Sequence, residues 1–219
     1  MRFTRTIVAT AVASVSLALM GAPAYAADVD VLTTGSLAGA NATAGDVLTA
    51  SLPSGTTAFF ATTSGGTTGV SCTASSFTAT VVDNPVAPGT ATESTTGQTF
   101  GTCTANILGV TSVSSVTVNN APFATTVASD GTVTVSGTST APIQTTLVLG
   151  TILGSITCVY QAASIAGTAS NTDNSITFTN QAFAKTSGAI TCPSNGYFTA
   201  VYAPVLDSTV AGSPAIFTN

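Results

Sequence analysis

The chain contains no His and no Trp, and Lys185 is its only basic residue after position 5. Without His, the usual Ser-His-Asp triad cannot form, and the imidazole ligands of most catalytic zinc sites are missing. Beyond residue 26 one Lys stands against eight acidic residues, so the composition provides no basic surface for nucleic acid or anionic lipid. These absences argue against an enzyme and against a nucleic-acid partner.

Residues 1–26 have the pattern of a secretion signal peptide. Arg2 and Arg5 form a basic start, residues 7–20 are apolar or small, and Ala24-Tyr25-Ala26 is a small-x-small cleavage motif. The apolar run is shorter than the roughly 20 residues that a membrane-spanning helix needs. We expect cleavage after Ala26, export to the extracellular space, and no membrane span in the rest of the chain.

The rest of the chain has the composition of a β-protein. Thr and Val are plentiful, and such β-branched side chains lose rotamer freedom in helices but pack well on pleated sheets. Val133 and Val135 alternate with Thr residues, and Ile156, Cys158 and Tyr160 share one parity, as in half-buried strands. The sequence therefore predicts an all-β fold.

Turn sequences separate these stretches at the short intervals typical of sandwiches and barrels. Asp130-Gly131 is the clearest, because both residues tolerate the positive φ of a type I′ hairpin turn, and it predicts paired strands near 124–129 and 132–137. We expect a single antiparallel β-sandwich, Ig-like or of a related Greek-key type, with two disulfides, and keep a β-barrel as the alternative. The predicted organisation is an N-terminal strand with a flexible Gly/Ala/Thr-rich region at 27–57, the β-sandwich domain at 58–205 and a C-terminal tail at 206–219.

The four cysteines, Cys72, Cys103, Cys158 and Cys192, predict two disulfides in an exported chain. We favour the sequential pairing, Cys72 with Cys103 and Cys158 with Cys192. The pairing of Cys72 with Cys158 and Cys103 with Cys192 stays open, because the residues before Cys72 and Cys158 are alike. A zinc site is not expected, since no C-x₂-C spacing is present and export favours oxidation. No metal or other cofactor is predicted.

The acidic residues show no catalytic pattern. Asp83, Asp130 and Asp173 stand beside Asn, Gly or Pro, where Asp side chains shape turns through local hydrogen bonds. A glycosidase needs two carboxyl groups about 5–10 Å apart, one of them with a raised pKa. Glu93 together with one of these Asp residues would supply such a pair, but nothing in the sequence marks it. We predict no catalytic residue among them.

Two other combinations of polar residues have simple structural interpretations. Asp28 and Asp30 would face one side of a strand, an arrangement that can bind Ca²⁺, but we interpret them as a solvated terminus. Lys185 and Ser187 would share a strand face, as in a Ser–Lys dyad, but a lone surface Lys is the simpler interpretation. The predicted site residues are therefore the four disulfide cysteines alone.

Several segments resemble small secreted actinobacterial proteins of unassigned function, which are often described as Tat-pathway signal-sequence domain proteins. The likeness covers roughly residues 58–205 and rests on cysteine context. A fainter resemblance is to the PraB family of secreted activators of alkane oxidation, in its Cys-Thr-Ala start and later paired cysteines. Neither resemblance implies a functional residue. The segments that carry the first likeness are 70–77, 102–103, 116–120, 141–143, 156–160 and 169–171.

Two classes of function fit these observations. The first is a secreted, non-enzymatic extracellular protein, a component of a surface, matrix or adhesive layer that contacts cell-envelope or matrix polymers. The alternative is a binding module for an apolar or carbohydrate ligand, accessory to uptake. A deep cavity lined by Phe and Leu would favour the second class over the first. The sequence predicts no oligomeric state.

Overall fold

The computed structural model describes residues 28–219, and the predicted signal peptide lies outside them. Every regular element in this part is a β-strand, so the all-β prediction is confirmed. Residues 28–219 include no helix of the length and hydrophobicity required to cross a membrane. The strands are β1 (Leu32–Thr34), β2 (Ala40–Asn41), β3 (Val47–Ser51), β4 (Ala58–Ala61), β5 (Gly69–Asp83), β6 (Thr90–Ala105), β7 (Val110–Asn119), β8 (Phe123–Ala128), β9 (Thr132–Ser136), β10 (Ile143–Thr151), β11 (Gly154–Ala162), β12 (Ser164–Ser170), β13 (Ser175–Gly188), β14 (Asn195–Tyr202), β15 (Leu206–Asp207) and β16 (Ile216–Thr218).

Eight of these strands close into a barrel, in the order β12-β9-β8-β6-β5-β4-β14-β13. The ring closes because residues Gly167–Ser170 of β12 pair antiparallel with Ser175–Phe178 of β13. Closure gives the backbone groups of both strands partners and leaves no open edge at this point of the sheet. The chain thus adopts the barrel that the sequence analysis kept as its alternative architecture.

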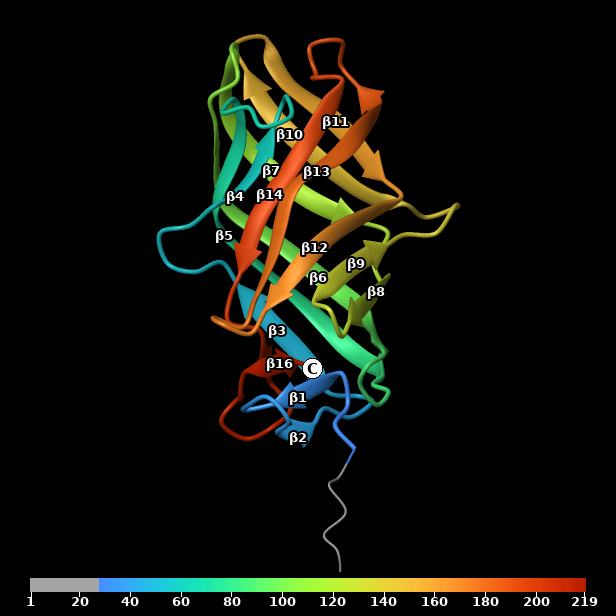
Figure 1. Cartoon of the computed structure of the whole chain (residues 1–219). Helices are drawn as coiled ribbons and strands as arrows, with labels where there is room; N and C mark the ends of the chain where they lie inside the picture. The colour runs from blue at the N-terminus through green and yellow to red at the C-terminus, as the bar shows by residue number, and fades with distance from the viewer. Residues whose placement is uncertain (1–27) are drawn as a thin grey trace, which may run out of the picture.

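The long strands give the barrel two levels. In β13, Ser175–Phe178 pair with β12, whereas Ala184–Gly188 pair with β11. In β6, Thr90–Thr95 pair with β8, and the strand also contacts β7. β11, β10 and β7 continue the sheet beyond β13 and form the upper wall in Figure 1. We call the end with the β6–β7, β10–β11 and β13–β14 turns the tip end, and the end with β1, β2 and β16 the base.

The hairpin expected at Asp130-Gly131 is present. β8 and β9 pair antiparallel up to Val127 and Val133, close to the predicted bounds. Gly131 has a φ of 84°, and the carboxylate of Asp130 accepts a hydrogen bond of 2.8 Å from the Thr132 amide. Of the two turn residues only Gly131 has a positive φ, so the turn is not of the predicted type I′, whereas the local hydrogen bonding expected of Asp130 is present.

The two terminal segments belong to the folded unit. β3 lies within the region 27–57 and pairs with β5 of the barrel, and β15 lies within the region 206–219 and pairs with β3. β1 pairs with both β2 and β16, so the two ends of the described chain meet in one small sheet at the base. The sequence analysis set these segments apart because their short strands carry few large apolar residues.

Both disulfides follow the sequential pairing, which is confirmed. Cys72 and Cys103 stand directly opposite each other on β5 and β6. Cys158 of β11 is bonded to Cys192 in the β13–β14 loop. Each bond closes a loop of about 30 residues, with separations of 31 and 34, which in the chain-entropy model contributes roughly 3–4 kcal/mol. The second bond also fastens the loop at the tip end to the barrel wall.

Candidate functional site

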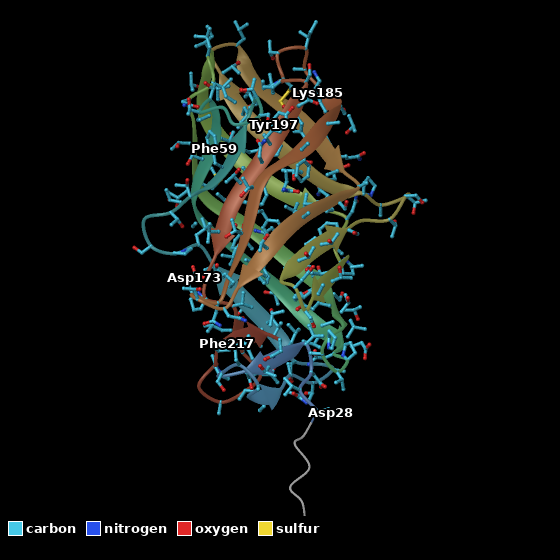
Figure 2. All side chains as sticks on the ribbon, in the orientation of Figure 1. Asp28, Phe59, Asp173, Lys185, Tyr197 and Phe217 are labelled. Carbon is cyan, nitrogen blue, oxygen red and sulfur yellow. A yellow bond between two sulfur atoms is a disulfide. The ribbon has the colours of Figure 1, made fainter. Side chains whose placement is uncertain are left out.

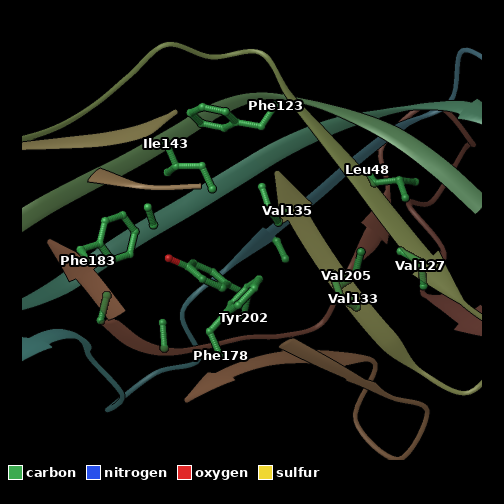
Figure 3. Packing of buried hydrophobic residues seen from close by; sticks show 14 of the residues in the cluster. Leu48, Phe123, Val127, Val133, Val135, Ile143, Phe178, Phe183, Tyr202 and Val205 are labelled. Atoms are coloured by element: carbon green, nitrogen blue, oxygen red, sulfur yellow. The ribbon is translucent and has the colours of Figure 1, made fainter. Parts of the chain in front are cut away.

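An internal cavity of about 90 Å³ lies within the barrel. Its walls are mainly apolar side chains that point inward from strands on all sides of the ring, and Figure 3 shows several of them around a common interior. A cavity of this character disfavours water unless polar partners are at hand. The lining includes Phe60, Phe123, Val133, Leu147, Phe178 and Phe183.

Aromatic rings form one end of the cavity. The ring of Phe60 packs edge-on against Tyr160 and Phe183, with centroid separations of 5.2 and 5.6 Å. Gly196 makes this position accessible, because a Cβ there would lie 2.0 Å from the Phe60 ring. Edge-to-face contacts of this kind add to the stabilisation from buried area alone. These rings are therefore firmly packed against one another.

A satisfied polar cluster lies on one wall. The Tyr202 hydroxyl is 2.8 Å from Ser75 Oγ and accepts a bond of 2.7 Å from Gln98 Nε2. Gln98 Nε2 also donates to Ser75 Oγ, which in turn donates to the carbonyl of Thr99. Burial raises the pKa of Tyr202 to about 12, so the hydroxyl remains neutral. This cluster fixes the ring of Tyr202 in the cavity wall.

Glu93 is the ionisable group in the lining that has no such support. It lies on β6 with the inward parity of Ala91 and Thr95, opposite Val81 and Thr125, and is 6% exposed. Burial is the one cause that raises the pKa of its carboxyl to about 7. Within residues 28–219 no donor and no cation contacts this carboxyl. An isolated carboxylate in apolar surroundings is costly, and the group becomes neutral instead.

Two hydroxyl groups beside Glu93, on Thr95 and on the opposite residue Thr125, are already paired with each other. Thr95 Oγ1 and Thr125 Oγ1 are 2.6 Å apart and share a hydrogen bond. Below Glu93 lies a second hollow of about 30 Å³ with polar residues in its lining, among them Asn171, Asn174 and Ser175. Glu93 lines both spaces. Its carboxyl therefore stands between an apolar chamber and a more polar one toward the base.

This arrangement can bind, but it has no second carboxyl group for hydrolysis. Asp83, Asp130 and Asp173 are exposed on or beside turns near the base, outside the barrel interior. Hydrogen bonds from Thr132 lower the pKa of Asp130, and the Ser175 hydroxyl lowers the pKa of Asp173. The structure therefore does not bring Glu93 together with any of them. The local turn role predicted for Asp130 and Asp173 is confirmed.

Lys185 and Ser187 do not form a dyad in the described chain. Lys185 Nζ donates to the carbonyls of Cys192, at 3.1 Å, and Ala189, at 3.5 Å. A β-bulge falls between the two residues, where Tyr160 pairs with Lys185 and Val159 with Ser187. The bulge breaks the two-residue alternation that would have placed both side chains on one face.

No metal cluster emerges from the acidic residues. Residues 28–219 contain no group of three or more His, Cys, Asp or Glu side chains able to hold an ion, and this includes Asp28 and Asp30. All four cysteines are in disulfides. Asp207 is fully buried near the base, where its Oδ1 accepts a bond of 2.9 Å from the Thr209 amide, while its Oδ2 has no partner among the described residues.

Sequence reasoning missed Glu93 as a cavity residue. The segment 90–98 reads Thr-Ala-Thr-Glu-Ser-Thr-Thr-Gly-Gln and has no large apolar residue to reveal which parity faces inward. The only available signal was the position of Glu93 two residues after Ala91 within a predicted β-region. No family model matches the chain, and no match was found among curated proteins or solved structures.

Proposed function

We propose that the protein is an extracellular binding module that holds a small, mainly apolar molecule inside the barrel, with Glu93 anchoring the molecule's polar end. The observation that carries this proposal is the apolar cavity with one unpartnered carboxyl group at its lower end. Binding sites for small molecules combine such a lining with a few polar groups that fix orientation. The predicted signal peptide and the two disulfides support an exported protein.

The size of the cavity limits the ligand. A volume of about 90 Å³ is smaller than the roughly 150 Å³ of an apolar cavity that takes up benzene. The ligand is therefore smaller than benzene, such as a short aliphatic alcohol or amine. A sugar ring is too large, and the wall offers too few hydrogen-bonding groups to replace its hydration. The apolar ligand of the sequence analysis is thus favoured over a carbohydrate.

The anchor selects a head group that hydrogen-bonds with a carboxyl group. With a pKa of about 7, Glu93 is partly protonated at neutral pH. The protonated form donates a hydrogen bond to an alcohol or carbonyl, and the ionised form accepts one from an amine. The wider role as a component of a surface, matrix or adhesive layer stays a prediction from the sequence, as does the resemblance to actinobacterial secreted proteins.

The test is an NMR titration of the secreted protein with 1-propanol, which follows the methyl groups of Val133, Ile143 and Leu147. We expect saturable shifts at these lining methyls and none at Leu37 or Val210, which are exposed near the base. Val135→Ile and Val135→Phe fill the cavity in two steps and should weaken binding progressively, because added carbons occupy the ligand's space. Shifts that never saturate, or equal affinity in the filled variants that remain folded, would contradict the proposal.

A further inference from the structure

Exposed aliphatic side chains lie on the turns at the tip end of the barrel. The β6–β7 turn carries Ile107-Leu108-Gly109, and the β10–β11 turn carries the same three residue types at 152–154. Gly109 and Gly154 both have positive φ, which shapes these short turns. We call four side chains the apolar tips, namely Leu108, Ile152, Leu153 and Ile190, which are 101%, 83%, 94% and 98% exposed.

The apolar tips project from one end of the molecule. Thr151 pairs with Val110, so the β6–β7 and β10–β11 turns are neighbours. Cys158 pairs with Gly188, which places the β13–β14 loop and Ile190 beside the start of β11. Figure 1 shows the β10–β11 and β13–β14 turns side by side at the top of the barrel. Three separate turns therefore carry the apolar tips in the same direction.

Such exposure is not the rule on this surface. The other large aliphatic side chains that are exposed lie near the base, and they retain contacts with their neighbours. Leu37 and Val82 are each 56% exposed, Val86 is 47% and Val210 is 41%. Scattered, half-covered aliphatic residues are normal on a soluble surface, whereas four that stand almost free in water at one end of the molecule indicate an interaction site.

The charges of the molecule are arranged along the same axis. The acidic residues of the described chain lie in the lower part of the barrel and at the base, where Figure 2 labels Asp28 and Asp173. Lys185 lies at the opposite end, and its ammonium group is bound to carbonyls of the β13–β14 loop. The tip end therefore presents apolar groups without any carboxylate that would be repelled by phosphate groups.

Several backbone groups of the three turns are hydrogen-bonded within their own turn. The Val110 amide donates to the carbonyl of Ile107, and the Cys192 amide donates to that of Ala189. In the β10–β11 turn, the Thr151 hydroxyl donates to the carbonyl of Gly154 and accepts from the Leu153 amide. Moving a turn from water into an apolar medium costs less free energy when its backbone groups are hydrogen-bonded to each other, because fewer polar groups lose their partners.

We propose that the tip end docks on a lipid surface, with the apolar tips entering the acyl region. A stable protein interface needs a continuous face of roughly 800 Å² on each partner, whereas three turn tips offer separated points. A fluid acyl layer surrounds separate points without any need for complementary shape. A chain with one Lys beyond the predicted signal also lacks the charges for binding to anionic head groups. The hydrophobic effect, through burial of the apolar tips in the acyl region, therefore drives the binding.

The absence of Trp from the chain allows a direct test on the secreted protein. The variant L108W places a single indole on a tip, and L37W places one at the base as its matched control. With phosphatidylcholine vesicles, the indole emission of L108W should shift to the blue and that of L37W should not. Adding Leu153→Ser to L108W should lower the partition coefficient roughly ten-fold, because a large aliphatic group no longer leaves water. Adding Val82→Ser should leave it unchanged.

Three outcomes would overturn the proposal. Equal shifts for L108W and L37W would mean nonspecific adsorption. Binding only to vesicles with phosphatidylglycerol, lost at high salt, would mean attraction by charge instead of apolar insertion. Self-association that Leu153→Ser abolishes, without vesicle binding, would assign the tips to contact between copies. Vesicle binding should persist in Val135→Phe, which fills the cavity but leaves the apolar tips unchanged. The vesicle experiment therefore tests the lipid proposal independently of the cavity proposal.

Discussion

Tyr202 and Glu93 line the same cavity, and burial raises the pKa of each, yet their surroundings are opposite. The Tyr202 hydroxyl has Ser75 and Gln98 as partners, whereas no donor or cation within residues 28–219 contacts the Glu93 carboxyl. For Tyr202, a pKa of about 12 preserves the neutral form that the side chain already has at neutral pH. For Glu93, a pKa of about 7 places ionisation near neutral pH.

This difference separates a polar group that stabilises the fold from one that the proposed binding function would use. A buried polar group with all its partners holds the fold in one arrangement. A buried acid without partners weakens the fold once it ionises, and such groups cluster at binding and catalytic sites. Hydrogen bonds thus hold Tyr202 in one arrangement, whereas the charge of Glu93 changes with pH. Three predictions test this contrast, beginning with the largest effect.

Stability should fall as the pH rises through the range between the two pKa values of Glu93. The carboxyl has an ordinary pKa of 4.5 and a folded-state pKa of about 7. The folded state therefore binds the proton more tightly, so the full stability is present below pH 4.5 and declines up to about pH 7. The decline is roughly 3 kcal/mol, which urea unfolding at a series of pH values measures.

Glu93→Gln is the control, because it keeps the shape and removes the ionisation. The variant should match the natural protein at about pH 4 and exceed it by roughly 3 kcal/mol above pH 7. The chain has no His, so no imidazole titrates in this range and obscures the effect. A natural protein whose stability stays flat between these pH values would show that Glu93 has a partner in solution.

Removing the Tyr202 hydroxyl should have a smaller effect of the opposite sign. Tyr202→Phe leaves the buried Ser75 hydroxyl without one of its partners, and we expect a loss of about 1–2 kcal/mol at every pH below 9. Tyr160→Phe is the matched comparison, because that hydroxyl makes one bond of 3.0 Å to the Pro193 carbonyl. Thermal unfolding of both variants measures the difference. If Tyr160→Phe costs more than Tyr202→Phe, the cluster is not the support we describe.

The sequence predicted those parts of the molecule that local chemistry determines. The strand class follows from β-branched residues, and the Asp130-Gly131 turn follows from residues that tolerate positive φ. The sequential disulfides were favoured on spacing, and they join neighbouring parts of the wall. Each of these features depends on residues that are close in sequence or on covalent geometry.

Closure of the barrel and the burial of Glu93 lie beyond such reasoning. β12 and β13 pair locally across the turn at residues 171–174, but the ring also needs β9 to pair with β12 and β4 with β14, strands far apart in sequence whose pairing no local motif predicts. Glu93 becomes buried because its side chain faces the interior of the closed barrel, where it lines both internal spaces. In a stretch of Thr, Ser and Gly, the inward parity has no apolar marker, so only the assembled sheet reveals it.

The smallest predicted effect concerns the threonine pair beside Glu93. The Thr95 and Thr125 hydroxyl groups share a hydrogen bond, with their Oγ1 atoms 2.6 Å apart. Thr125 lies directly opposite Glu93. Thr95→Val should cost no more than about 1 kcal/mol, because the freed Thr125 hydroxyl can turn toward the carboxyl and donate to it. That bond would favour the ionised form, so the pKa of Glu93 should fall below its value in the natural protein. In the double variant with Thr125→Val no free hydroxyl remains, so the loss of stability should return close to zero and the pKa of Glu93 should again be raised.

Carboxyl NMR titration of Glu93 in the three proteins distinguishes these states. An unchanged pKa in Thr95→Val would show that the isolation of Glu93 is enforced by the barrel wall itself and not by the pairing of its neighbours.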